Sequence, residues 1–187
     1  MLIFAAMAYD TPINEEKLDI DERWFAELGE SKEAFAKLYE ATSTTIYAYA
    51  FTFLRNRSDA EDIMQDTFLK IRSAAHLYTP QGKPLAWILT ITRNLCLMKL
   101  RSGKYTSDMP LDEDSESLFD AIKDSEDRMV LEAAFKVLTE EESRIIILHA
   151  VSGLKHREIA SMLSIPLTTV LSKYRRALAK LRNAIEA

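Results

Sequence analysis

The sequence contains little of what disulfide bonds and β-hairpins require. Its 187 residues include four glycines, five prolines and one cysteine. Hairpins draw heavily on glycine at their turns, and the lone Cys96 can neither form an internal disulfide nor supply a zinc-binding spacing. Alanine, leucine, glutamate, lysine and methionine, which favour helices, are plentiful. The composition therefore predicts an all-α fold.

A long hydrophobic run is also missing. Residues 1–9 are apolar, but this run is too short to span a bilayer. It lacks the basic leader and the long apolar core of a secretion signal. We therefore expect a cytoplasmic protein with no membrane insertion of its own.

Signatures of common enzymes are missing as well. The sequence contains no P-loop, no glycine-rich nucleotide fingerprint and no Ser-His-Asp set in a suitable setting. His76, His149 and His156 are isolated, with no cysteine or carboxylate partner at zinc spacing. We expect no catalytic activity, no metal site and no cofactor.

The formal net charge of -5 is distributed unevenly along the chain. Residues 1–26 carry a net charge of -4 and residues 104–127 a net charge of -7, whereas residues 27–103 carry +2 and residues 128–187 carry +4. Charges act locally in physiological salt. The two mildly basic segments are therefore suited to an anionic partner despite the acidic total.

This pattern predicts two small helical domains joined by an acidic linker. We place an N-terminal arm at residues 1–23, the first domain at 24–103, the linker at 104–127 and the second domain at 128–187. The linker is interpreted as a solvated, self-repelling spacer. The alternative is that it competes with DNA for the basic surfaces.

The second domain has the pattern of a helix-turn-helix. Thr139 with Glu142 forms a capping box, so a helix begins there and ends at Ser152 and Gly153. A short helix follows in LKHREIASMLSI, and Pro166 opens a final, basic helix near Leu167. Two short helices joined by a tight turn, the second one basic, are typical of DNA-binding proteins.

The final helix has two distinct faces at about 100° per residue. Its apolar stripe consists of Val170, Tyr174, Ala177, Leu178 and Leu181. Another stripe consists of Thr169, Ser172, Lys173 and Arg176, whose hydroxyls and cations can bond phosphates and purine edges in a major groove. A solvated basic face is the plainer interpretation of such a helix on its own. The capped helix and the proline-led turn before it favour DNA contact.

Residues 134–183 resemble the C-terminal region-four domain of bacterial sigma factors in the extracytoplasmic-function (ECF) group. The resemblance implies that this domain holds the promoter's minus-thirty-five element. The implied contact residues are Thr168, Thr169, Ser172, Lys173 and Arg176. Thr168 stands where family members commonly have glycine, and Leu171 where many have a basic or polar residue, so we expect a different base preference.

The first domain begins with a core-facing helix at residues 33–57, with apolar residues at helical spacing. They are Phe35, Leu38, Tyr39, Ile46, Ala50 and Leu54. Ser58 is expected to cap the next helix, with Glu61 completing a capping box. An acidic and polar patch on that helix consists of Glu61, Asp62, Gln65 and Asp66. The helix dipole alone offers one explanation for acidic residues at this end.

The segment DAEDIMQDTFLKI resembles the region-two segment of the same family, which docks on the clamp helices of the polymerase beta-prime subunit. The resemblance implies a polymerase-binding set of Glu61, Asp62, Gln65, Asp66 and Phe68.

A third helix is predicted from Pro84, with Ile88, Ile91, Leu95 and Met98 toward the core. Its other face carries Thr90, Arg93, Asn94 and Arg101. Trp87 lies on the border, where it either stacks on an unpaired base or packs in the core.

The segment WILTITRNL resembles the helix with which the family reads the minus-ten element. With the loop at residues 79–83 included, the expected contacts are Lys83, Trp87, Thr90, Arg93, Asn94 and Arg101.

Together these matches identify an ECF sigma factor of the sigma-70 family as the group that the chain resembles. The resemblance implies three partners: core RNA polymerase, through its beta-prime clamp helices and beta flap, promoter DNA, and an anti-sigma factor. Two other functions fit parts of the pattern. One is a dimeric helix-turn-helix repressor or activator; the other is a scaffold that binds polymerase without reading DNA.

Overall fold

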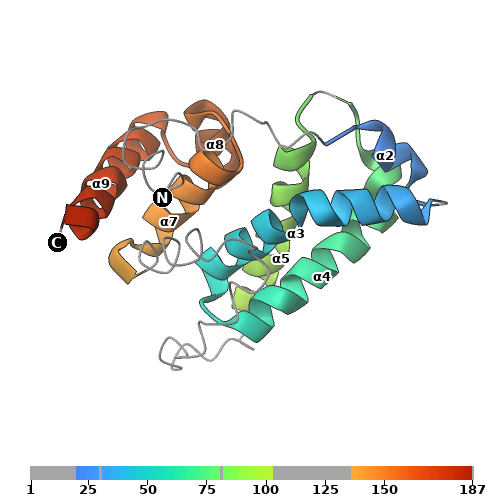
Figure 1. Cartoon of the computed structure of the whole chain (residues 1–187), viewed down its shortest axis with the longest axis horizontal. Helices are drawn as coiled ribbons and strands as arrows, with labels where there is room; N and C mark the ends of the chain where they lie inside the picture. Colours follow the sequence, from blue (N-terminus) through green and yellow to red (C-terminus); the bar gives the residue numbers. More distant parts are fainter. Residues whose placement is uncertain (1–19, 30, 81, 103–135, 187) are drawn as a thin grey trace. The chain divides into compact units, whose positions relative to one another are not determined.

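The computed structural model describes residues 20–29, 31–80, 82–102 and 136–186 (Figure 1). These residues form helices and no strand, which confirms the all-α prediction. Residues 20–102 and residues 136–186 belong to two separate compact units, which we call the N-terminal unit and the C-terminal unit. The proposed linker lies outside the described residues. No helix within them is long and apolar enough to cross a membrane.

The N-terminal unit is built on three long helices that pack together (Figure 1). They are α3 (Lys32–Leu54), α4 (Arg57–Ala74) and α5 (Pro84–Arg101), accompanied by the short α2 (Arg23–Glu27) and the 3-10 turn η1 (Ala75–Leu77). Fully buried side chains from all three long helices form the core: Leu38, Ile46, Tyr49, Leu54, Ile71, Ile88 and Leu89. The unit also includes residues 20–23, which we had placed in the arm, since Ile20 is buried.

Helix α3 is capped at its start and buried over its second half. The Ser31 hydroxyl accepts a hydrogen bond from the Ala34 amide at 3.1 Å. Every residue from Thr45 to Leu54 is buried. Of the six predicted core residues, Phe35 is half-buried and Tyr39 is 41% exposed, whereas the other four are buried. A helix that buries all its sides cannot be described by one apolar stripe.

Helix α4 begins two residues earlier than Ser58 would place it. Asn56 is the N-cap, and its side-chain oxygen accepts a hydrogen bond from the Asp59 amide at 2.9 Å. Glu61 instead forms an ion pair with Arg57 at 2.8 Å. The predicted capping box was therefore wrong. Asn and Ser are comparable N-cap residues, so residue type alone does not distinguish Asn56 from Ser58.

Helix α5 is rotated relative to the predicted core face. Its buried residues are Leu85, Ile88, Leu89, Thr92 and Cys96, whereas Met98 is 63% exposed. The Thr92 hydroxyl donates to the Ile88 carbonyl at 3.1 Å and lies 3.4 Å from the Thr67 hydroxyl of α4. These hydrogen bonds satisfy the Thr92 hydroxyl, so a polar residue can lie at the centre of the buried face. Cys96 is buried on the same face.

The C-terminal unit consists of α7 (Glu140–Ile146), the π-helical turn η3 (Ile147–Val151), α8 (His156–Leu163) and α9 (Leu167–Glu186) (Figure 1). The predicted capping box is present: Thr139 Oγ1 accepts from the Glu142 amide at 3.3 Å, and Glu142 Oε2 accepts from the Thr139 amide at 2.9 Å. Gly153, at φ 65°, takes the left-handed conformation expected after the first helix.

The predicted apolar stripe of α9 is confirmed in full. All five of its residues are at most 7% exposed: Val170, Tyr174, Ala177, Leu178 and Leu181. The Tyr174 ring forms T-shaped contacts with His149 and His156, which stack on each other with centroids 4.2 Å apart. These two half-buried histidines therefore have a packing role where η3, α8 and α9 meet.

Candidate nucleic-acid and polymerase interfaces

The predicted DNA-contact residues of α9 lie away from the buried stripe. Thr168, Ser172 and Arg176 are exposed, whereas Thr169 and Lys173 are half-buried. The Ser172 hydroxyl donates to the Thr169 carbonyl at 3.0 Å, and Arg176 Nε donates to the Ser172 carbonyl at 3.3 Å. Hydroxyl and guanidinium groups thus occur together on the outer side of α9, as contact with phosphates and base edges requires.

Two lysines of α9 form ion pairs with the first turn of α7. Lys173 pairs with Glu141, and its side chain is 21% exposed. Lys180 pairs with Glu142 at 2.6 Å, and the Glu142 side chain is only 4% exposed. Lys173 is one of the predicted DNA contacts, and the structure also gives its ammonium an acidic partner within the protein.

These ion pairs lower the pKa of both glutamates. The Lys173 ammonium lowers the pKa of Glu141 below its ordinary value. Burial alone would raise the pKa of Glu142, but the bonds from Lys180 and from Thr139 outweigh burial and leave it lowered. Both carboxylates are thus stabilised in the charged form that pairs with α9.

The predicted minus-ten contacts follow α5 from its start. Lys83, Thr90, Asn94 and Arg101 are exposed, and Arg93 is half-buried. The exposed members are separated by whole helical turns along α5, so they form a polar and basic face opposite its buried residues.

Trp87 belongs to a cluster of three aromatic rings. Its ring meets Phe25 of α2 edge-on with centroids 5.5 Å apart and Tyr78 at 5.3 Å. Phe25 and Tyr78 stack on each other at 4.4 Å. Trp87 is half-buried. The structure thus gives this residue a packing role while leaving part of its ring accessible.

Sequence reasoning missed Glu22, which holds the segment before α5. Glu22 Oε1 accepts hydrogen bonds from the Tyr78 hydroxyl at 2.5 Å and from the Gly82 amide at 2.7 Å. The partners lie 56 and 60 residues away in the chain. No local pattern reveals a contact over such a separation.

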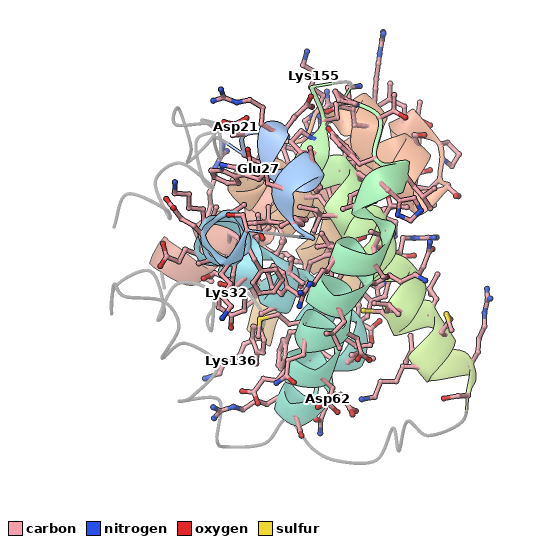
Figure 2. All side chains as sticks on the ribbon, turned by 90° about the vertical axis from the view of Figure 1, so that its right-hand side faces the viewer. Asp21, Glu27, Lys32, Asp62, Lys136 and Lys155 are labelled. Carbon is pink, nitrogen blue, oxygen red and sulfur yellow. The ribbon has the colours of Figure 1, made fainter. Side chains whose placement is uncertain are left out.

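The predicted polymerase-binding patch lies near the start of α4, where Figure 2 labels Asp62. Gln65 and Asp66 are exposed, and the side chain of Asp62 is 63% exposed. Lys99 of α5 lies 3.5 Å from Asp62 and 2.5 Å from Asp59. Burial acts to lower the pKa of Lys99, but the carboxylates of Asp59 and Asp62 together outweigh it and raise the pKa.

Phe68 differs from the other members of the predicted polymerase-binding set. Its side chain is 3% exposed, and its ring meets Tyr39 at 4.8 Å and Phe35 at 5.9 Å. We expected Phe68 to contact polymerase, but its ring is buried and packs α4 against α3. Tyr39, 41% exposed, covers it from outside.

Family models match both units. Residues 38–105 match Sigma-70 region 2, and residues 128–181 match Sigma-70, region 4. The chain is 30% identical over 168 residues to the ECF RNA polymerase sigma factor SigK of Mycobacterium ulcerans, which covers 83% of this chain and 88% of that protein. SigK of Mycobacterium tuberculosis is 29% identical over 167 residues, covering 84% and 89%.

Two solved structures share the fold. CnrH, in complex with the cytosolic domain of CnrY, is similar with a TM-score of 0.60 and 21% identity, covering 90% of this chain and 98% of that one. The sigma factor RpoE from Bartonella quintana, in complex with the anti-sigma factor NepR, is similar with a TM-score of 0.62 and 23% identity, covering 82% and 97%. With both region models and SigK matched along most of its length, the chain belongs to the ECF sigma factors of the sigma-70 family.

Proposed function

We propose that this protein directs core RNA polymerase to specific promoters and assists DNA melting there. The observation that carries the proposal is α9: its apolar stripe is completely buried, and hydroxyl and guanidinium groups face outward from a helix-turn-helix. In this proposal Thr168, Thr169, Ser172 and Arg176 contact the minus-thirty-five element. Lys173 joins them when it leaves Glu141.

The N-terminal unit is proposed to bind the minus-ten element through α5. Thr90, Arg93, Asn94 and Arg101 supply donors for phosphates and bases, and the exposed part of Trp87 offers a surface for stacking. Lys83 and its neighbours before α5 would receive a base extruded from the duplex. Extrusion costs a few kcal/mol, so such a receptor makes melting more favourable.

Docking on polymerase is assigned to the exposed polar residues of α4, namely Asp62, Gln65 and Asp66, with Glu61 beside them. Their contact would be the beta-prime clamp helices, while the C-terminal unit would contact the beta flap. Each unit offers few phosphate contacts, so its own affinity for DNA is weak and sensitive to salt. Fixing both units on one polymerase makes the second contact intramolecular and raises the overall affinity.

Control by an anti-sigma factor is part of the proposal. RpoE from Bartonella quintana, whose fold this chain shares, was solved with the anti-sigma factor NepR. We expect such a protein to cover the α4, α5 or α9 surfaces in the inactive state. The proposal makes the chain a cytoplasmic regulator without catalytic activity.

The test is run-off transcription with core polymerase on a genomic promoter library, with and without this protein. Selective initiation that depends on the protein is expected. A dimeric repressor or activator would instead bind a palindrome tightly without polymerase, and a scaffold would keep its activity when Arg176 is replaced by alanine. If no transcript depends on the protein, the proposal is refuted.

A further inference from the structure

The segment at residues 20–27 lies before the part of the chain that matches region 2, which begins at residue 38. It nevertheless contacts the connection between η1 and α5. We call residues 78–80, 82 and 83 of this connection the α5 loop. The loop includes Lys83 and leads directly into the helix proposed to bind the minus-ten element.

One carboxylate oxygen joins the two ends of this loop. Glu22 Oε1 accepts from the Tyr78 hydroxyl at 2.5 Å and from the Gly82 amide at 2.7 Å. Hydrogen bonds to a charged acceptor are stronger than those between neutral groups. Gly82 has a φ of 69°, a conformation that favours glycine. Glu22 therefore connects Tyr78 and Gly82, at opposite sides of the loop, through one oxygen atom.

Aromatic packing connects the same segment to α5. Phe25, 4% exposed, stacks on Tyr78 and meets Trp87 edge-on. Tyr78 is thus held twice, by its hydroxyl on Glu22 and by its ring on Phe25. Through Trp87 this contact reaches the first turn of α5, next to Lys83 at the N-cap. Glu22 at the N-cap of α2 and Phe25 within α2 therefore hold Tyr78 of the loop next to the first turn of α5.

We propose that Glu22 is a positioning residue for promoter melting. By ordering the α5 loop before DNA arrives, it removes part of the conformational entropy that the loop would lose on receiving an extruded base. This inference rests on the function proposed above. It predicts that Glu22 acts at the melting step, and that polymerase docking through α4 and duplex contact through α9 do not depend on it.

The experiment compares full-length variants in run-off transcription with core polymerase on two templates. Both carry a promoter selected by the unaltered protein; in one, mismatched bases hold the minus-ten region open. Glu22→Ala should lower transcription from the duplex about tenfold, since two charge-assisted bonds are lost. On the opened template, transcription with Glu22→Ala should stay within about twofold of that with the unaltered protein, because the DNA is already melted.

Tyr78→Phe and Glu27→Ala are the companion variants. Tyr78→Phe keeps the ring cluster and removes the hydroxyl that bonds to Glu22, so a decrease of about threefold on the duplex is expected. In a protein that already carries Glu22→Ala it should have no further effect. Glu27 is the last residue of α2, five residues after Glu22, and is exposed (Figure 2). Its replacement by alanine removes the same charge and should leave both templates unaffected.

The outcomes separate the inference from the proposed function. Equal activity of Glu22→Ala and the unaltered protein on the duplex refutes the positioning role alone. Equal losses on both templates, or a Tyr78→Phe effect that persists without Glu22, also refute it, because they assign Glu22 to folding or docking. If the unaltered protein initiates on neither template, the proposed function fails and this inference with it.

Discussion

The two units hold their proposed DNA-binding helices by different means. In the C-terminal unit, α9 is bound to α7 by two ion pairs, Lys173 with Glu141 and Lys180 with Glu142. In the N-terminal unit, the start of α5 is held by three aromatic rings and by the bonds of Glu22 to the α5 loop. Both helices also pack through buried residues. Beyond that packing, ion pairs help to position α9, and aromatic rings and a loop help to position the start of α5.

This difference matches the two tasks proposed for the helices. Reading a duplex needs a rigid helix whose exposed face fits a groove of fixed shape. Capturing an extruded base needs an ordered loop next to a helix. Ion pairs weaken with salt and acid, whereas aromatic packing does not titrate. Substitution, salt and pH should therefore disturb the attachment of α9 and that of the start of α5 to different extents.

The largest expected effect is the loss of the ring at the centre of the C-terminal unit. Tyr174 is 4% exposed and contacts both His149 and His156. Tyr174→Ala should lower the free energy of unfolding of this unit by about 3 to 5 kcal/mol, since a large buried ring leaves a cavity. Amide hydrogen exchange along α9 measures this change in the free energy of unfolding. A loss below about 1 kcal/mol would contradict the packing described here.

Removal of Glu142 should have the next largest effect. Glu142→Ala leaves the Lys180 ammonium and the Thr139 amide without their acceptor. A cost of about 2 to 3 kcal/mol in the free energy of unfolding is expected, measured by urea titration. Glu140→Ala is the matched control on the same turn. The Glu140 side chain is 57% exposed and pairs with Arg144 one turn later in the same helix, so its loss should cost about 0.5 kcal/mol.

The same glutamate predicts a pH dependence. The pKa of Glu142 is lowered in the folded state, below an ordinary value of 4.5. Its contribution to stability is therefore present above pH 4.5 and is lost as the pH falls through the folded pKa. Glu142→Gln should flatten this acid dependence in urea titrations at several pH values. An unchanged slope would show that other groups are responsible.

A smaller effect is expected for Arg176, which is exposed on the outer side of α9. Arg176→Ala should weaken promoter binding by the complex with polymerase about tenfold, within the range of one good base contact. The stability of the protein should stay unchanged. Fluorescence anisotropy on a labelled promoter measures the affinity. Arg175, also exposed on α9, is the matched control, and an equal loss on its replacement would indicate general charge rather than a specific contact.

The smallest effect concerns the Lys173 pair. Glu141→Gln releases the ammonium from its acidic partner, so binding to the promoter should tighten about twofold in low salt. If Lys173 then reaches a phosphate, the slope of log affinity against log salt should become steeper by about one unit. A salt titration of the same anisotropy signal tests this. An unchanged slope would restrict Lys173 to holding α9 against α7.

The buried face was predictable for α9 but not for α5. A helix with one buried side shows its core in the spacing of apolar residues, and the stripe from Val170 to Leu181 followed that rule. In α5 the buried face includes Thr92, a polar residue whose bonds are visible only in the structure. Spacing alone therefore favoured Met98, which is exposed.

Candidate site residues were predictable where they lie close together in the chain. The exposed polar faces of α4, α5 and α9 contain most of the expected residues, since each face belongs to one helix. Contacts between distant segments were not predictable: Glu22 with Gly82, and Glu141 with Lys173. Phe68 was misplaced for the same reason, because Tyr39 and Phe35 cover it from another helix.

The central claim is that these two units bind a promoter usefully only when polymerase holds both. The most direct measurement is the affinity for one selected promoter at physiological salt, first of the isolated protein and then of its complex with core polymerase. We predict weak, poorly selective binding by the isolated protein and tight, selective binding by the complex. Tight selective binding by the isolated protein, or no gain from polymerase, would contradict the claim.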